Sequence, residues 1–205
     1  MTTPQFHVLH HTDAAALAAE AAAGLLARPA RVAPKFFYDA LGSRLFDAIT
    51  ALDEYYPTRT EAAILQRDGA EIAALALAAA GPRPVLVDLG AGDGAKAARL
   101  FEALRPRRYV AVDISVDYLR AALQQRQRQH PDVEMVGVGT DFSTRLALPA
   151  GIVEGPALVF YPGSSIGNFA PDDALRLLRE ARATAAGGAL LVGADLVDRK
   201  STRLN

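Results

Sequence analysis

The sequence contains no cysteine, and this absence excludes disulfide bridges and cysteine-ligated zinc. At 205 residues the chain can bury well over half of the surface that its unfolded form exposes, so it needs no such staple. A surplus of positive charge is also missing, because 22 Lys and Arg face 23 Asp and Glu and leave a formal net charge of −1. A protein that binds a phosphate backbone normally carries such a surplus. We therefore expect no nucleic-acid partner.

Long apolar runs are missing as well. No stretch approaches the roughly 20 residues of a transmembrane helix. The first residues lack the basic flank and apolar core of a signal peptide. The sequence therefore predicts a cytoplasmic protein without a membrane partner, and it indicates neither an obligate protein partner nor a metal site.

The first 84 residues are typical of helices joined by loops. An alanine-rich stretch at 12–26 predicts a helix that Thr12 or Asp13 caps, and the residues before it are expected to be loose. The run Gly81-Pro82-Arg83-Pro84 predicts a firm break. Between these points we expect a short helix at 42–49, a loop at 54–59 and a helix at 61–80.

After this break, short apolar runs alternate with helical patterns. Such a run is typical of a strand that is buried on both faces of a sheet. The alternation predicts an α/β fold with a parallel sheet and right-handed crossovers. The expected strands are 85–89, 109–113, 133–137, 157–160 and 189–193, and the expected helices are 95–104, 116–129 and 171–186. The fifth strand has no later strand beside it in the sequence, so we expect it to form an exposed edge.

The strongest local pattern is the glycine loop from Asp88 to Gly94, which follows the first expected strand. In an open parallel sheet, such a turn lies at the carboxyl ends of the strands, where ligands bind. Gly90 and Gly92 let the backbone turn sharply and approach a ligand closely. The GxGxG spacing differs from the GxGxxG of dinucleotide-binding proteins. It favours a nucleoside with an amino-acid tail, such as S-adenosylmethionine.

Polar residues follow the next three expected strands. Asp113 ends the second strand, where a carboxylate can accept hydrogen bonds from both ribose hydroxyls. After the third strand, Asp141 can accept a hydrogen bond from the adenine amino group while Phe142 packs on the base. The loop after the fourth strand carries Gly163, which permits close approach, and Asn168, a neutral donor and acceptor.

Four segments together resemble a known family. They are PKFFYD at 34–39, YYPTR at 55–59, the glycine loop through Lys96, and YPGSSIGN at 161–168. From about residue 34 to 196, the sequence resembles the histidine-specific, S-adenosylmethionine-dependent methyltransferases of ergothioneine biosynthesis. The resemblance implies a Rossmann-like class I methyltransferase sheet. It also implies three successive methylations of the L-histidine α-amino group, which give hercynine.

The resemblance and the loop patterns together assign roles to single residues. Tyr56 and Asn168 are expected to hold histidine near its amino and carboxylate groups, with Gly163 lining the same pocket. Tyr38 matches an aromatic position close to the methylated nitrogen, so the expected catalytic residues are Tyr38, Tyr56 and Asn168. Lys96 is expected to pair with the methionyl carboxylate. The residues expected to bind the cofactor are Gly90, Gly92, Lys96, Asp113, Asp141 and Phe142.

The expected organisation has three parts. Residues 1–60 form the N-terminal helical part of the substrate-binding domain, 61–198 a partial Rossmann-like methyltransferase domain, and 199–205 an unpatterned tail. Chains of the resembled family are longer and carry an insertion after the fifth strand, so this sequence is expected to be C-terminally truncated. Two alternatives stay open. One is a non-catalytic cofactor-binding fragment, and the other is an NAD(P)-dependent oxidoreductase, against which the glycine spacing argues.

Overall fold

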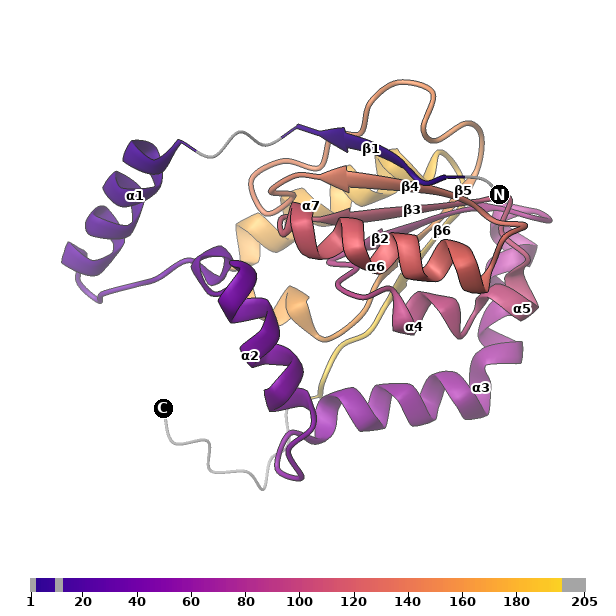
Figure 1. Ribbon diagram of the computed structural model, residues 1–205, viewed down its shortest axis with the longest axis horizontal. Helices are drawn as coiled ribbons and strands as arrows, with labels where there is room; N and C mark the ends of the chain where they lie inside the picture. The colour runs from indigo at the N-terminus through magenta and orange to yellow at the C-terminus, as the bar shows by residue number, and fades with distance from the viewer. Residues whose placement is uncertain (1–2, 10–12, 197–205) are drawn as a thin grey trace.

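The computed structural model of the protein describes residues 3–9 and 13–196 (Figure 1), so the predicted tail at 199–205 lies outside the described residues. In chain order, the elements are β1 (Gln5–Val8), α1 (Ala14–Leu26), the 3-10 helix η1 (Pro34–Phe37), α2 (Ala40–Thr50), α3 (Tyr56–Ala80), β2 (Val85–Leu89), α4 (Ala95–Ala98), α5 (Phe101–Leu104), β3 (Arg108–Asp113), α6 (Val116–Gln129), β4 (Glu134–Gly139), β5 (Ala157–Tyr161), the 3-10 helix η2 (Ser165–Asn168), α7 (Pro171–Ala185) and β6 (Ala189–Val192).

The described strands form one six-stranded parallel sheet in the order β1-β4-β3-β2-β5-β6 (Figure 1). The predicted α/β class and parallel sheet are confirmed. The strand order reverses at β2, which pairs with β3 on one side and β5 on the other. Loops that leave the carboxyl ends of these neighbouring strands therefore meet at the switch point of the sheet, where ligands bind in such folds.

Two cores cover the two faces of the sheet. On one face, side chains such as Leu86 and Phe160 pack with helices α3, α4, α5 and α6. On the other face, Val87 and Val159 pack with α7 and with the segment that leads into β5. Every residue of β2 and β5 is buried, which explains why these strands are continuous apolar runs in the sequence.

The N-terminal residues depart from the prediction. They were expected to be loose, but residues 5–8 form β1, which pairs in parallel with β4 from Val136 to Gly139. The Phe6 ring fills the space over Gly137, which leaves no room there for a Cβ. The Arg120 guanidinium lies 4.4 Å from the centroid of the Phe6 ring on α6's side. Strand β1 thus covers the β4 edge of the sheet, while β6 forms the other edge, with half-buried side chains.

The first helix confirms its predicted cap. Asp13 Oδ1 accepts the N–H groups of Ala15 and Ala16 at 2.9 and 3.1 Å, whereas Thr12, the other predicted cap, lies outside the described residues. Helix α1 has no buried residue and stands apart from the sheet, at the left of Figure 1. No helix in the described part of the chain is long and apolar enough to cross a membrane.

Two helix predictions need correction. The expected loop at 54–59 is wrong from Tyr56 onward, because α3 begins there with Pro57 in its first turn, where the missing N–H of proline costs no hydrogen bond. The expected helix at 95–104 is divided into α4 and α5. Helix α3 also runs through residue 60. The division of the chain into two domains at that residue stays a prediction.

Candidate functional site

The glycine loop between β2 and α4 is tied to the end of β3. The N–H groups of Gly90 and Ala91 donate to the Val112 carbonyl at 2.9 and 3.1 Å, and the N–H of Gly92 donates to Asp113 Oδ2 at 2.9 Å. Gly90 and Gly92 have φ angles of +71° and +54°, a left-handed backbone that favours glycine. The sharp turn predicted for this loop is therefore present, and Gly90, directly after β2, is exposed.

Asp113 has accepting capacity beyond the bonds that hold the loop. Its Oδ1 accepts the N–H of Ser115 at 2.9 Å, and its Oδ2 accepts Gly92. Burial raises the pKa of Asp113, although the backbone donors at Ser115, Gly92 and Ile114 act in the opposite direction. An ionised carboxylate has about four lone-pair sites. The hydrogen bonds from Ser115 and Gly92 occupy one site on each oxygen, so each oxygen can also accept a hydrogen bond from a ligand hydroxyl.

Asp141 and Phe142 extend the same site from the end of β4. The Asp141 side chain is buried and accepts both the hydroxyl and the N–H of Ser143, the latter at 3.0 Å. The Phe142 ring tip lies 3.8 Å from the position that a Cβ on Gly90 would take, so the ring reaches to the glycine loop. It also meets the Tyr161 ring edge to face at 6.0 Å. These contacts bring three predicted cofactor-binding residues together.

Lys35 in η1 belongs to the PKFFYD segment, but the sequence assigned this lysine no role in the site. Its Nζ lies 3.2 Å from Asp141 Oδ2 and 2.8 Å from Glu20 Oε2, and its side chain is 12% exposed. Burial lowers the pKa of Lys35, but the hydrogen bonds to Glu20 and Asp141 outweigh burial and raise the pKa above its usual value. The N-terminal segment is thereby linked to the predicted adenine-binding carboxylate.

Lys96 and Gly163, both predicted from the sequence, are brought together by a third residue. Glu61 Oε2 lies 2.6 Å from Lys96 Nζ, and Glu61 Oε1 accepts the N–H of Gly163 at 2.7 Å. Glu61 follows the YYPTR motif by two positions, and its place near that motif was the one available signal. The cofactor side and the substrate side of the predicted site thus share one carboxylate.

The predicted substrate residues lie on two neighbouring segments. Tyr56 begins α3, is half exposed, and donates its hydroxyl to Asp195 Oδ2 at 2.8 Å. The N–H of Asp195 donates to Ser164 Oγ at 2.9 Å, so the segment after β6 connects Tyr56 with the loop after β5. Asn168 ends η2 in that same loop and is exposed. Asp195 is a further site residue that the sequence did not single out.

Tyr38 completes the predicted set on the side of the N-terminal segment. It is half-buried, and burial raises the pKa of its hydroxyl, with further contributions from Tyr55 and Asp113. Burial likewise raises the pKa of Tyr161, and Tyr38 adds to that shift. Both hydroxyls therefore stay neutral at physiological pH. The Tyr38 ring meets the Phe46 ring of α2 edge to face at 6.1 Å.

Beneath the glycine loop, Asp88 is an acid buried in the core. It is 1% exposed, and its Oδ2 accepts the hydroxyl of Tyr109 at 2.7 Å. Its Oδ1 has no hydrogen-bond partner within the described part of the chain. Burial raises the pKa of Asp88 from 3.8 to about 7, against the opposing effects of the Tyr109 hydrogen bond and the Lys96 charge. The carboxyl is therefore partly protonated near neutral pH.

Asp88 predicts a pH dependence of stability. Because the folded state binds this proton more tightly than the unfolded state, its contribution favours folding at low pH and is lost as pH rises from about 4 to about 7. The loss at full ionisation is on the order of 4 kcal/mol. We expect wild-type protein to lose melting temperature relative to Asp88→Asn over this range, measured by thermal melts in a pH series. A difference between the two proteins that stays constant with pH would contradict the shift.

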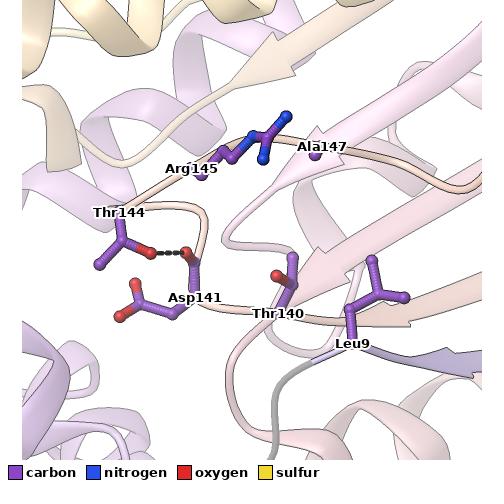
Figure 2. Close-up of a pocket in the computed structure, with 6 residues that line it drawn as sticks. All are labelled: Leu9, Thr140, Asp141, Thr144, Arg145 and Ala147. Carbon is purple, nitrogen blue, oxygen red and sulfur yellow. Dashed lines mark hydrogen bonds between the residues drawn. The ribbon is translucent and has the colours of Figure 1, made fainter.

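A pocket of about 260 Å³ lies beside the loop that follows β4 (Figure 2). The Thr144 hydroxyl donates to the Asp141 carbonyl at 2.9 Å, which closes this loop on itself. Figure 2 shows the Asp141 carboxylate directed away from Arg145 and Ala147. The residues that line the pocket are Leu9, Thr140, Asp141, Thr144, Arg145 and Ala147. Of these residues, Asp141 alone belongs to the predicted site.

Comparisons with known proteins agree with the sequence motifs. A family model described as histidine-specific methyltransferase, SAM-dependent, matches residues 17–204. A histidine N-alpha-methyltransferase from Mycolicibacterium smegmatis is 42% identical over 189 residues, which cover 90% of this chain and 57% of the relative. The corresponding enzyme of Mycobacterium tuberculosis is 40% identical over 188 residues, or 89% of this chain and 56% of the relative. The chain thus spans about half the length of these curated relatives.

The fold also has solved counterparts. Magnesium protoporphyrin IX methyltransferase (ChlM) from Synechocystis PCC 6803, solved with bound SAM, matches with a TM-score of 0.52 at 16% identity. The match covers 73% of this chain and 69% of that chain, and at this identity it supports the fold alone. The predicted Rossmann-like class I sheet is confirmed. Taken with the family model and the relatives, these findings show that the chain belongs to the family of S-adenosylmethionine-dependent, histidine-specific methyltransferases.

Proposed function

We propose that this protein binds S-adenosylmethionine over the glycine loop and transfers methyl groups to the α-amino group of L-histidine, three times in succession, to give hercynine. The observation that carries the proposal is the Asp113 carboxylate, which borders the glycine loop and can still accept two ribose hydroxyls. The substrate is inferred from the family and from the two mycobacterial relatives.

The residues around the loop fit the parts of this nucleoside. Asp113 would accept hydrogen bonds from the ribose hydroxyls, and the buried Asp141 would accept one from the adenine amino group. Phe142, whose ring reaches the glycine loop, would pack on the base. Lys96 would pair with the methionyl carboxylate, while the left-handed backbone at Gly90 allows close approach.

The protein's contribution to the chemistry is mainly to position the amine. Bound S-adenosylmethionine supplies an electrophilic methyl group on a sulfonium. The histidine nitrogen must arrive neutral, and Tyr56 meets it as an acceptor because its hydroxyl proton is donated to Asp195. The Asn168 amide provides a second uncharged partner. Protons released between methylations pass to water at the exposed side of Tyr56, so no dedicated base is needed. The ring faces of Tyr38 and Tyr56 stabilise the growing cation.

Two measurements on the wild-type chain test the proposal. Calorimetric titration should show binding of S-adenosylhomocysteine and no binding of NADH. Mass spectrometry after incubation with S-adenosylmethionine and L-histidine should show mono-, di- and trimethylated products. Binding of S-adenosylhomocysteine without methyl transfer would support the alternative of a non-catalytic cofactor-binding fragment. Binding of NADH alone would overturn the proposal in favour of an oxidoreductase.

Substitutions at Tyr56 and Asn168 separate substrate binding from cofactor binding. Tyr56→Phe and Asn168→Ala should each weaken L-histidine binding about tenfold, because each removes one hydrogen bond. The affinity for S-adenosylhomocysteine should stay unchanged. Titration with histidine in the presence of S-adenosylhomocysteine measures the first effect, and titration with the nucleoside alone measures the second. Unchanged histidine affinity contradicts the assignment, whereas loss of both affinities indicates a folding defect.

A further inference from the structure

One acidic side chain of helix α3, Glu61, reaches the loops at the carboxyl edge of the sheet. Glu61 lies in the second turn of α3, and its side chain is 17% exposed. One oxygen, Oε1, accepts the N–H of Gly163 at 2.7 Å in the turn after β5. The other, Oε2, is buried and lies 2.6 Å from Nζ of Lys96 in α4. The carboxylate therefore joins two segments to which the proposed function gives different roles.

The packing around Glu61 leaves little room for movement. Gly193, directly after β6, has no space for a Cβ because Oε1 of Glu61 occupies it. A Cβ on Gly163 would lie 3.1 Å from Lys96 Nζ, so the lysine head lies directly against this turn. Helix α3, helix α4, the loop after β5 and the end of β6 converge on one carboxylate. Its position is thus fixed from several sides.

This arrangement holds Lys96 before any ligand arrives. A lysine side chain without a partner samples many rotamers, and fixing it costs side-chain entropy. The ion pair with Glu61 imposes that cost during folding, and the lysine, still 32% exposed, retains N–H groups for another acceptor. The Glu61–Lys96 pair carries no net charge, and neither does an amino-acid tail with one ammonium and one carboxylate. The ion pair between Lys96 and Glu61 therefore reduces the electrostatic attraction for the whole tail only a little.

We propose that Glu61 is a positioning residue that fixes Lys96 and the Gly163 turn in the arrangement that receives the amino-acid tail of the sulfonium nucleoside. This inference rests on the proposed function, because the tail is that of S-adenosylmethionine. It assigns Glu61 no contact with the reacting atoms.

The test compares two ligands that differ in the tail alone. S-adenosylhomocysteine carries it, and 5′-methylthioadenosine keeps the nucleoside and the thioether without it. Glu61→Gln keeps an oxygen for the Gly163 N–H but loses the charge that holds Lys96. We expect this variant to bind S-adenosylhomocysteine about tenfold more weakly, with 5′-methylthioadenosine within about twofold of wild type. Glu71→Gln, an exposed change on the same helix, should alter neither affinity.

The same substitution in a Lys96 variant separates the effect of the Glu61–Lys96 contact from a general loss of stability. In Lys96→Met protein, adding Glu61→Gln should cause no further loss of S-adenosylhomocysteine affinity, because the two residues act through one contact. Equal weakening of both ligands, or unchanged or stronger binding of S-adenosylhomocysteine by Glu61→Gln, would overturn the role of Glu61. If wild-type protein binds neither ligand, the proposed function fails and this inference fails with it. If wild type binds both and only the Glu61 results disagree, the proposed function stands.

Discussion

Asp113→Ala is expected to lower the affinity for S-adenosylhomocysteine by more than about 100-fold. The variant loses two hydrogen bonds from ribose hydroxyls to a charged acceptor, each contributing about 1.5–3 kcal/mol. It also removes the acceptor of the Gly92 N–H, so the glycine loop loses one of the three hydrogen bonds that tie it to the end of β3. Both effects lower the affinity for the same ligand. Calorimetric titration of the variant and of wild type measures the loss.

Controls separate this binding effect from unfolding. Asp117→Ala removes an exposed carboxylate four positions further along the chain, at the start of α6, and should leave the affinity unchanged. Circular dichroism should show a folded Asp113→Ala protein, since the sheet core does not depend on this side chain. The affinity of Asp113→Asn for S-adenosylhomocysteine should lie between those of Asp113→Ala and wild type, because an amide keeps a single acceptor oxygen. Wild-type affinity in folded Asp113→Ala protein would remove Asp113 from the site.

Gly188→Ala is expected to destabilise the fold by about 3 kcal/mol or more, with a fall in melting temperature of about 6–12 °C. A Cβ at this position would overlap the carbonyl oxygen of Ala157 and lie 2.7 Å from its nitrogen. Both atoms belong to the backbone of β5, the strand beside β6, so no side-chain rotation can relieve the overlap. The strands would have to separate where β6 begins. Thermal and urea unfolding of the variant measure the effect.

The matched control for this substitution is Gly167→Ala in the loop after β5. A Cβ at Gly167 meets no atom within 4 Å, so the stability should change little. The position of β6 also matters for the site, because the Gly193 carbonyl, directly after the end of this strand, accepts the N–H of Ser164 at 3.0 Å. Wild-type stability of Gly188→Ala protein would mean that β6 does not begin beside Ala157.

The strands of the sheet interior were predictable because their physical signal is local. Strand β2 has the predicted bounds, 85–89, since a run of apolar residues between a Pro break and a glycine loop admits few other structures. Strand β1 left no comparable signal. It has four residues, of which Gln5 and Val8 are exposed, and it exists because β4 offers an unpaired edge. The start of α3 was missed because Pro57 suits both a loop and a first helical turn.

The predicted site divides in the same way. Gly90, Asp113 and Asp141 lie at the carboxyl ends of three neighbouring strands, and parallel pairing brings such residues together without further information. Glu61 and Lys35 reach the same loops from the N-terminal helices, and their partners lie far away in the sequence. No local spacing encodes contacts of that kind. They depend on how α3 and η1 pack against the sheet.

The parallel pairing of β1 with β4 sets an order of events during synthesis. Gln5 is synthesised about 130 residues before its partner Val136, a delay of about 7–26 seconds at about 5–20 residues per second. Throughout that interval the strand has no edge to join, and the Phe6 ring has no Gly137 to cover. Strand β1 can therefore dock only after β4 has been synthesised, and a nascent chain that ends before β4 carries β1 unpaired.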